Sequence, residues 1–140
     1  MRVEAKGRVF SGIGKGGYYV GHAEYQKRFR QYLGYAPYPG TLNIKIEDRG
    51  SIERIAKVRA AGGIRIEGFR IGGESFSSLI CVKGELRGEA ITLLFIDVTH
   101  YNESVVELVS PTYLRGRFGL KDGDEVTFSL ESPGPSPGTP

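Results

Sequence analysis

The chain has very little cysteine and no long apolar segment, and each shortage excludes a class of protein. Cys81 is the only cysteine in 140 residues, which excludes an internal disulfide and a zinc cluster built from several cysteines. No apolar run reaches the ~20 residues that a membrane-spanning helix requires, and residues 1–6 lack the apolar stretch of a secretory signal. We therefore expect a cytoplasmic protein that does not bind membranes, with Cys81 packed as a small buried side chain.

The phosphate-binding motifs of the common nucleotide folds are also missing. No Gly-Lys-Ser/Thr triplet occurs, which excludes a Walker loop. Gly12, Gly14 and Gly17 satisfy the G-x-G-x-x-G spacing, but the dinucleotide-binding motif requires a helix directly after the loop. Residues 18–20, Tyr-Tyr-Val, are typical of a strand, so this spacing does not predict a dinucleotide fold.

Length and charge indicate one globular domain whose first third attracts anions. A chain of 140 residues has the usual size of a single domain with one core. Residues 1–45 hold eight Lys and Arg against two acidic residues, whereas the rest of the chain carries a net negative charge. A positive field in this region favours an anionic ligand, and a solvated basic face is the alternative interpretation.

A glycine-rich segment lies inside this basic region. It reads Gly12-Ile13-Gly14-Lys15-Gly16-Gly17, four glycines with one cation. Glycine accepts positive φ and lets a ligand approach the main chain, so the N–H groups of this segment can converge on a polyphosphate beside Lys15. The alternative interpretation is a plain glycine turn between two strands.

A rigid turn, Pro37-Tyr38-Pro39-Gly40, leads into Thr41 and Asn43. On a strand those two side chains share one face, where a hydroxyl and an amide oxygen can complete the coordination of a phosphate-bound Mg²⁺. Hydrogen bonding within the turn is the alternative role for both residues.

Glu107 is the candidate acid–base group. Strand alternation puts its carboxylate on the face opposite Val106 and Leu108, where it faces either a cleft or solvent. In a cleft it can accept a proton from a substrate hydroxyl. His22 and His100 have no supporting acids or cysteines, so we interpret them as surface or hydrogen-bonded residues and not as metal ligands.

Apolar periodicity predicts a mostly β fold with two or three short helices. The predicted helices are residues 23–33, ending at Gly34; residues 51–61, capped by Ser51; and residues 110–118, opened by Ser110-Pro111. The predicted strands are 2–11, 18–20, 42–45, several between 64 and 98 with turns at 72–73, 83–84 and 87–88, then 105–109 and 126–130. The continuous apolar run 90–96 predicts a strand buried on both faces.

Many short strands joined by glycine turns favour a closed or nearly closed β-barrel. We expect the barrel domain to span residues 1–131. Residues 132–140, rich in Pro, Gly and Ser, are expected to form a disordered tail.

Four separated motifs resemble, in the same order, those of the archaeal CTP-dependent riboflavin kinases. They are SGIGKGGYY at 11–19, LGYAPYPGTLNIK at 33–45, ELVSP at 107–111, and LR at 114–115 followed by LKDGDEV at 120–126. The similarity runs from about Val3 to Leu130. It implies a small, closed, six-stranded cradle-loop β-barrel that transfers the γ-phosphate of CTP to the 5′-hydroxyl of riboflavin, giving FMN and CDP.

The resemblance also implies the roles of individual residues. Segment 12–17 and the segment Thr112-Tyr113-Leu114-Arg115 would contact the nucleotide, Thr41 and Asn43 would hold one Mg²⁺, and Thr99 and Glu107 would contact the flavin. Phosphoryl transfer depends on alignment and charge stabilisation, so we expect Lys15 to stabilise the transferred phosphate and Glu107 to orient or deprotonate the riboflavin hydroxyl.

The expected partners are therefore riboflavin and CTP, with no nucleic acid and a monomeric state. Some members of the family carry an N-terminal helix-turn-helix domain, whereas this sequence starts at the barrel, and no DNA-binding module is expected.

Residues 120–126 also resemble the closing turn of swapped-hairpin transcription-factor barrels, so a nucleic-acid-binding or regulatory barrel is the alternative. Such a protein would spread basic and aromatic residues over one face. A nucleotide-binding barrel without kinase activity is the third possibility.

Overall fold

The computed structural model describes residues 1–12, 14–96 and 104–132. In chain order the elements are β1 (Arg2–Phe10), α1 (Gly16–Val20), α2 (Ala23–Leu33), β2 (Leu42–Lys45), α3 (Arg49–Ala61), β3 (Ile64–Ile66), β4 (Phe69–Ile71), β5 (Glu74–Phe76), β6 (Leu79–Leu86), β7 (Glu89–Ile96), β8 (Val105–Val109), α4 (Leu114–Phe118) and β9 (Glu125–Glu131).

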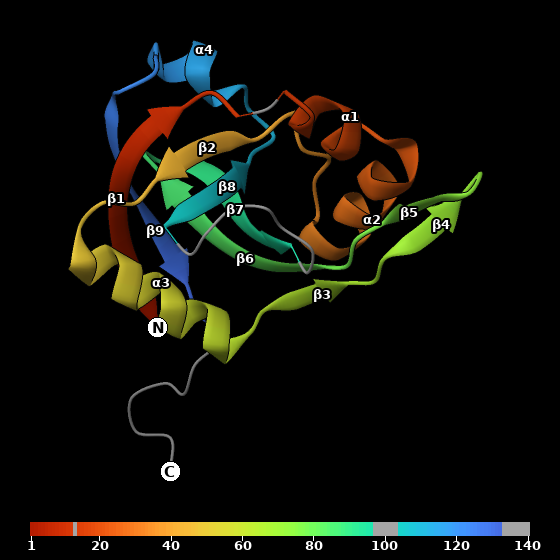
Figure 1. Cartoon of the computed structure of the whole chain (residues 1–140), viewed down its shortest axis with the longest axis horizontal. Coiled ribbons are helices and arrows are strands. Elements are labelled where there is room, and N and C mark those ends of the chain that lie inside the picture. Colours follow the sequence, from red (N-terminus) through yellow and green to blue (C-terminus); the bar gives the residue numbers. More distant parts are fainter. Residues whose placement is uncertain (13, 97–103, 133–140) are drawn as a thin grey trace.

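Six antiparallel strands close into a barrel (Figure 1). Their order is β6-β7-β8-β2-β1-β9, and β9 pairs back with β6, while β3 adds to the outer edge of β6. The expected mostly β, closed six-stranded barrel is confirmed. Within the described ranges the fold has four helices, where the sequence predicted two or three.

The barrel closes at Gly84, in the middle of β6. There β6 meets β9 through the pairs Gly84–Leu130 and Glu85–Ser129. A Cβ at Gly84 would lie 1.8 Å from the carbonyl oxygen of Ser129, so only glycine lets the two backbones approach this closely. The predicted turn at 83–84 is therefore wrong, because this glycine marks a close approach of two strands and not the end of one.

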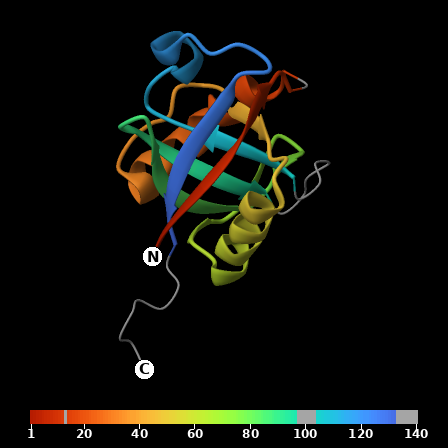
Figure 2. The same ribbon diagram turned by 90° about the vertical axis from the view of Figure 1, so that its left-hand side faces the viewer.

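The barrel interior holds the main core, which includes Val9, Ile44, Leu93, Leu108, Phe128 and Leu130, each at most 1% exposed. Four consecutive residues of β7, Ile91–Leu94, are buried, which confirms that this strand is covered on both faces. Helix α3 lies beside β1 and adds Ile55 and Val58 to the core (Figure 2). Ser51 does not cap α3 as predicted, because Asp48 is the N-cap and accepts a hydrogen bond from the Ser51 N–H.

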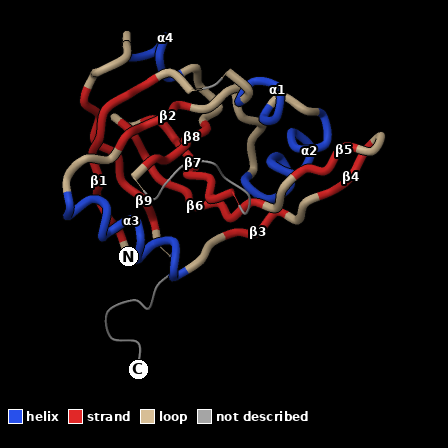
Figure 3. The backbone as a smooth tube through the Cα atoms, viewed as in Figure 1, coloured by secondary structure: helices blue, strands red, loops and turns tan. Residues whose placement is uncertain are grey.

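A second apolar cluster joins α2 to one side of the barrel. The predicted helix 23–33 is confirmed, and it buries Tyr25, Phe29 and Leu33 against residues of β3, β5, β6 and β7, whereas Tyr32 stays exposed. Strands β4 and β5 form a separate two-stranded sheet beside α2 (Figure 3). This side of the molecule, made by α1, α2 and the β4–β5 hairpin, contains the site described below.

Two local predictions differ from the structure. Residues 18–20 belong to α1 and not to a strand, since only Gly21 and His22 separate Val20 from α2 and the N–H groups of Tyr19 and Gly21 bond back to Lys15 and Gly17. Helix α4 starts at Leu114, later than predicted, because Ser110 does not act as its cap. The Ser110 hydroxyl instead donates to the Ala90 carbonyl.

Strands β1 and β9 run side by side (Figure 2). The Ser132 N–H donates to the Met1 carbonyl. The domain boundary at residue 131 stays a prediction, because residues 133–140 lie outside the described residues. Among the helices that the structure describes, none combines the length and the apolar character needed to cross a membrane.

Candidate active site

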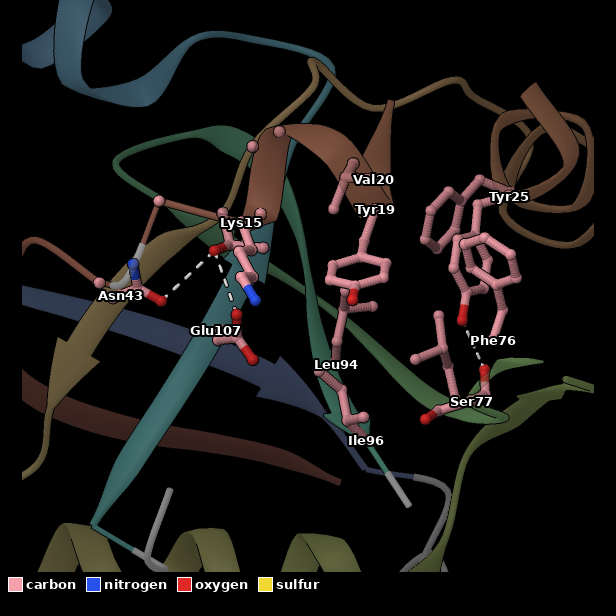
Figure 4. Close-up of a pocket in the computed structure, with 18 of the residues that line it drawn as sticks. Lys15, Tyr19, Val20, Tyr25, Asn43, Phe76, Ser77, Leu94, Ile96 and Glu107 are labelled. Carbon is pink, nitrogen blue, oxygen red and sulfur yellow. Dashed lines mark hydrogen bonds between the residues drawn. The ribbon is translucent and has the colours of Figure 1, made fainter. Parts of the chain in front are cut away.

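A cavity of about 590 Å³ opens between the barrel and the side formed by α1, α2 and the β4–β5 hairpin. It has two chemically different parts (Figure 4). We call them the polar half, lined by Ser11, Gly12, Gly14, Lys15, Gly16, Gly17, Gly40, Thr41, Asn43, Glu107 and Arg115, and the apolar half, lined by Tyr19, Val20, Tyr25, Phe29, Phe76, Leu79, Leu94 and Ile96. Ser75 and Ser77 add polar groups beside Phe76.

The glycine segment forms one wall of the polar half. Gly14 has φ +82°, a left-handed conformation that favours glycine. A Cβ at Gly16 would lie 2.9 Å from the Thr41 hydroxyl oxygen, so the absence of a side chain lets the start of α1 rest against the Pro-Gly turn. Lys15 occupies the N-cap position of α1, and its side chain enters the polar half (Figure 4). The two motifs that the sequence singled out therefore lie together.

Thr41, Asn43 and Glu107 meet beside the glycine segment. Asn43 of β2 is the cross-strand partner of Glu107 of β8. The Thr41 hydroxyl contacts both neighbours, at 3.3 Å from Asn43 Oδ1 and 3.2 Å from Glu107 Oε1. Strand alternation buries Val106 and Leu108 in the core and turns Glu107 into the cavity, which agrees with the cleft interpretation of this residue.

The environment of Glu107 favours the neutral carboxyl group. Burial raises its pKa above the ordinary 4.5, and the hydrogen bond from Thr41 opposes part of that rise. A raised pKa makes the ionised carboxylate a stronger proton acceptor than an exposed one.

These three oxygen-bearing side chains fit a hard divalent cation. A hydroxyl, an amide oxygen and a carboxylate are the ligand types that Mg²⁺ takes in proteins, usually with waters and phosphates completing the shell. Within the described residues no group of three His, Cys, Asp or Glu side chains gathers in the manner of a transition-metal site. The donor set at Thr41 and Asn43 therefore suits Mg²⁺ bound together with phosphate.

Of the expected nucleotide segment 112–115, only Arg115 lines the cavity. Leu114 is buried in the barrel core. The Thr112 hydroxyl donates to Glu89 at 3.0 Å. Tyr113 is half exposed, and its ring stacks on that of Tyr38 with 4.8 Å between ring centroids. The structure thus brings one member of this segment, Arg115, to the glycine wall.

The apolar half was not recognised from the sequence as part of a site. Tyr25 and Phe29 belong to segment 23–33, whose apolar periodicity predicts a helix and no site, and nothing in the spacing of Ser75 and Phe76 points to a ligand. The Tyr25 hydroxyl donates to the Ser77 carbonyl at 2.6 Å, and burial raises the Tyr25 pKa to about 12. The Tyr18 hydroxyl donates to Glu74 at 2.6 Å, which links α1 to the hairpin.

The remaining sequence predictions have mixed outcomes. Ile13, Thr99 and His100 lie outside the described residues. His22 is hydrogen-bonded as expected, since it caps α2 by accepting the Glu24 N–H at its Nδ1. Cys81 is buried, which confirms its interpretation as a small core residue, and burial raises its pKa to about 12.

Comparison with known protein families finds a match over most of the chain. The family model CTP-dep_RFKase, described as "Domain of unknown function DUF120", matches residues 9–130. This chain belongs to that family. The matched range contains every described residue that lines the cavity.

The relatives include several archaeal proteins named riboflavin kinase. The chain is 41% identical over 130 residues to the one from Archaeoglobus fulgidus, an alignment that covers 91% of this chain and 54% of that protein. It is 42% identical over 124 residues to the one from Thermoplasma volcanium, covering 89% of this chain and 56% of the relative. The Aeropyrum pernix protein is 40% identical over 133 residues, covering 91% of this chain and 96% of the relative. The chain thus spans about half the length of the first two and nearly all of the third.

Proposed function

We propose that this chain catalyses transfer of the γ-phosphate of CTP to the 5′-hydroxyl of riboflavin, giving FMN and CDP. The observation that carries the proposal is a single cavity whose polar and apolar halves meet beside Thr41, Asn43 and Glu107. A flavin kinase must hold a polyanion and a planar apolar ring system with their reacting ends together, and this cavity offers one environment for each.

The polar half suits the triphosphate. Lys15 and Arg115 are the two cations among the described residues that line it, and the main chain of the glycine segment can supply N–H groups. Positive charge aimed at the transferred oxygens stabilises a loose transition state without any nucleophilic side chain.

The apolar half suits the isoalloxazine ring of riboflavin. Tyr19, Tyr25 and Phe76 provide aromatic surface, and Leu94 and Ile96 of β7 provide the facing aliphatic surface (Figure 4). With the ring there, the ribityl chain extends toward Glu107 and its terminal hydroxyl reaches the phosphate.

The reaction then follows from this alignment. The 5′-oxygen of riboflavin attacks the γ-phosphorus, the bond from that phosphorus to the oxygen it shares with the β-phosphate breaks, and CDP leaves with that oxygen. The proton of the attacking hydroxyl passes to the carboxylate of Glu107. Thr41 and Asn43 would hold Mg²⁺, which when bound neutralises phosphate charge.

Product analysis tests the proposal. The protein is incubated with riboflavin and Mg²⁺ together with CTP or, in parallel, ATP, and FMN is resolved by chromatography. We expect FMN with CTP and much less with ATP, a preference that follows family membership. Equal amounts of FMN from CTP and ATP would contradict the proposed preference for CTP as the phosphate donor. Nucleotide binding without FMN would favour a nucleotide-binding barrel, and salt-dependent nucleic-acid binding without FMN would favour the regulatory alternative.

A further inference from the structure

Asp122 links two walls of the polar half without lining the cavity itself. Its Oδ1 accepts a hydrogen bond from Arg115 Nη2 at 2.9 Å, and its two carboxylate oxygens lie 3.0 and 2.9 Å from the Ser11 hydroxyl. Ser11 directly precedes the glycine segment and lines the cavity with it, and Arg115 is the only member of segment 112–115 among the described cavity residues. One carboxylate therefore touches both the start of the glycine segment and the arginine.

The turn that carries Asp122 is held in place independently of that side chain. The Gly123 N–H donates to the Val9 carbonyl at 2.8 Å, and the Val9 N–H donates to the Asp124 carbonyl at 2.9 Å. Asp124 closes the same turn by accepting the Lys121 N–H through its side chain. The backbone on both sides of Asp122 is therefore held by hydrogen bonds that do not involve the Asp122 side chain.

Arg115 is oriented by two acceptors at once. Its Nη2 donates to the Phe10 carbonyl at 3.2 Å as well as to Asp122. A guanidinium held between a carbonyl and a carboxylate loses most of its rotational freedom, so less entropy is lost when its other N–H groups bind an anion.

The ion pair contributes little to stability. The Asp122 side chain is 57% exposed and that of Arg115 26%, and an exposed pair of this kind adds little to the free energy of folding. Arg115 and Ser11 together lower the pKa of Asp122, so this group is ionised wherever the protein is folded near neutral pH. Asp122 lies beside the proposed anion site, where its negative charge weakens the positive field. Because the ion pair adds little to folding stability, stability does not explain the presence of this acid.

We propose that Asp122 is a positioning residue for nucleotide binding, which holds Arg115 and the start of the glycine segment in the arrangement that receives the polyphosphate. This inference rests on the proposed function. It assigns no contact between Asp122 and the nucleotide, since the carboxylate acts through Arg115 and Ser11.

The test compares Asp122→Asn with Asp124→Asn as a matched control. Asp124 lies in the same turn, and the contacts of its side chain involve neither Ser11 nor Arg115. Binding of CDP with Mg²⁺ is measured by calorimetry, KM and kcat by FMN formation, and Tm by thermal unfolding. We expect Asp122→Asn to weaken CDP binding and raise KM for CTP about tenfold, with kcat within about threefold of the parent and Tm nearly unchanged.

A double-mutant cycle separates positioning from a structural effect. In an Arg115→Ala background, Asp122→Asn should weaken CDP binding clearly less than it does in the parent, because one of the two groups through which it acts is gone and only Ser11 is left. An undiminished loss in that background, or equal losses for Asp122→Asn and Asp124→Asn, would overturn the inference. If the parent protein binds CDP but forms no FMN, the proposed function fails, and the calorimetric cycle still decides the role of Asp122.

Discussion

The Thr41 hydroxyl lies 3.2 Å from the Glu107 carboxylate, although 66 residues separate the two along the chain. This contact joins the Pro-Gly turn to β8 and puts the candidate metal ligands beside the candidate base. Glu107 is also the cross-strand partner of Leu94, a residue of the apolar half, so the two halves of the cavity meet at Glu107. The first prediction follows from that position.

Glu107→Gln should lower kcat for FMN formation by about 10² to 10⁴, because the amide accepts no proton from the riboflavin hydroxyl. Binding of CDP should change by less than about threefold. Glu85→Gln is the matched control, since Glu85 is an exposed glutamate that pairs with Arg2. Full turnover by the Glu107→Gln variant would show that Glu107 takes no part in the proton transfer.

Burial of Glu107 also predicts a pH dependence of stability in the metal-free protein. Since its folded-state pKa lies above the ordinary 4.5, the folded state binds this proton more tightly than the unfolded state does. The resulting stabilisation is complete below the unfolded pKa and is lost as pH rises through the folded pKa. Urea unfolding of the parent and Glu107→Gln proteins between pH 4 and 8 measures it. We expect the parent to lose stability relative to the variant with rising pH, and parallel curves would contradict the raised pKa.

Lys15→Ala should lower kcat/KM for CTP about tenfold, equivalent to roughly 1.4 kcal/mol, because a cation is removed from the phosphate-facing wall. The fold should be unaffected, since Lys15 is exposed at the N-cap of a one-turn helix and makes no side-chain cap hydrogen bond. Lys27→Ala, on the exposed face of α2, is the control for loss of positive charge alone. An unchanged kcat/KM for Lys15→Ala would exclude this residue from the site.

Thr41→Val should raise the Mg²⁺ concentration needed for half-maximal FMN formation by about tenfold, because an isosteric methyl replaces the hydroxyl proposed to bind the metal. Thr41→Ser retains the oxygen and should restore most of the Mg²⁺ affinity. Titration of Mg²⁺ at saturating CTP and riboflavin measures both variants. If the two variants respond alike, the hydroxyl does not hold the metal.

Gly84→Ala should destabilise the protein by about 3 kcal/mol, because the added Cβ would lie 1.8 Å from the Ser129 carbonyl oxygen at the closure of the barrel. Denaturant unfolding gives the free energy, and Lys83→Ala, the exposed neighbour on β6, controls for lost strand propensity. A loss no larger than that of Lys83→Ala would show that β6 and β9 separate there at little cost.

Short-range patterns predicted much of this fold. Helix 23–33 and its end at Gly34, strand 42–45, the fully buried segment of β7 and the final strand are confirmed because apolar periodicity and glycine conformation act over a few residues. The same patterns misled at residues 18–20, where strand-forming side chains adopt a helical turn. They also gave a wrong prediction at Gly84, which lies in strand β6 where β9 approaches it closely, and not in a turn.

The sequence by itself determined that this chain has a glycine-rich segment, a Pro-Gly turn followed by two side chains that carry oxygen, and an isolated strand glutamate. Only the tertiary structure decided that they face one cavity, that Arg115 also lines it and pairs with Asp122, and that the aromatic face of α2 continues the cavity into an apolar half. The physical reason is one of range. Backbone preferences and periodicity are local, whereas the meeting of residues 66 apart depends on strand register and on barrel closure, which arise only when the whole chain packs.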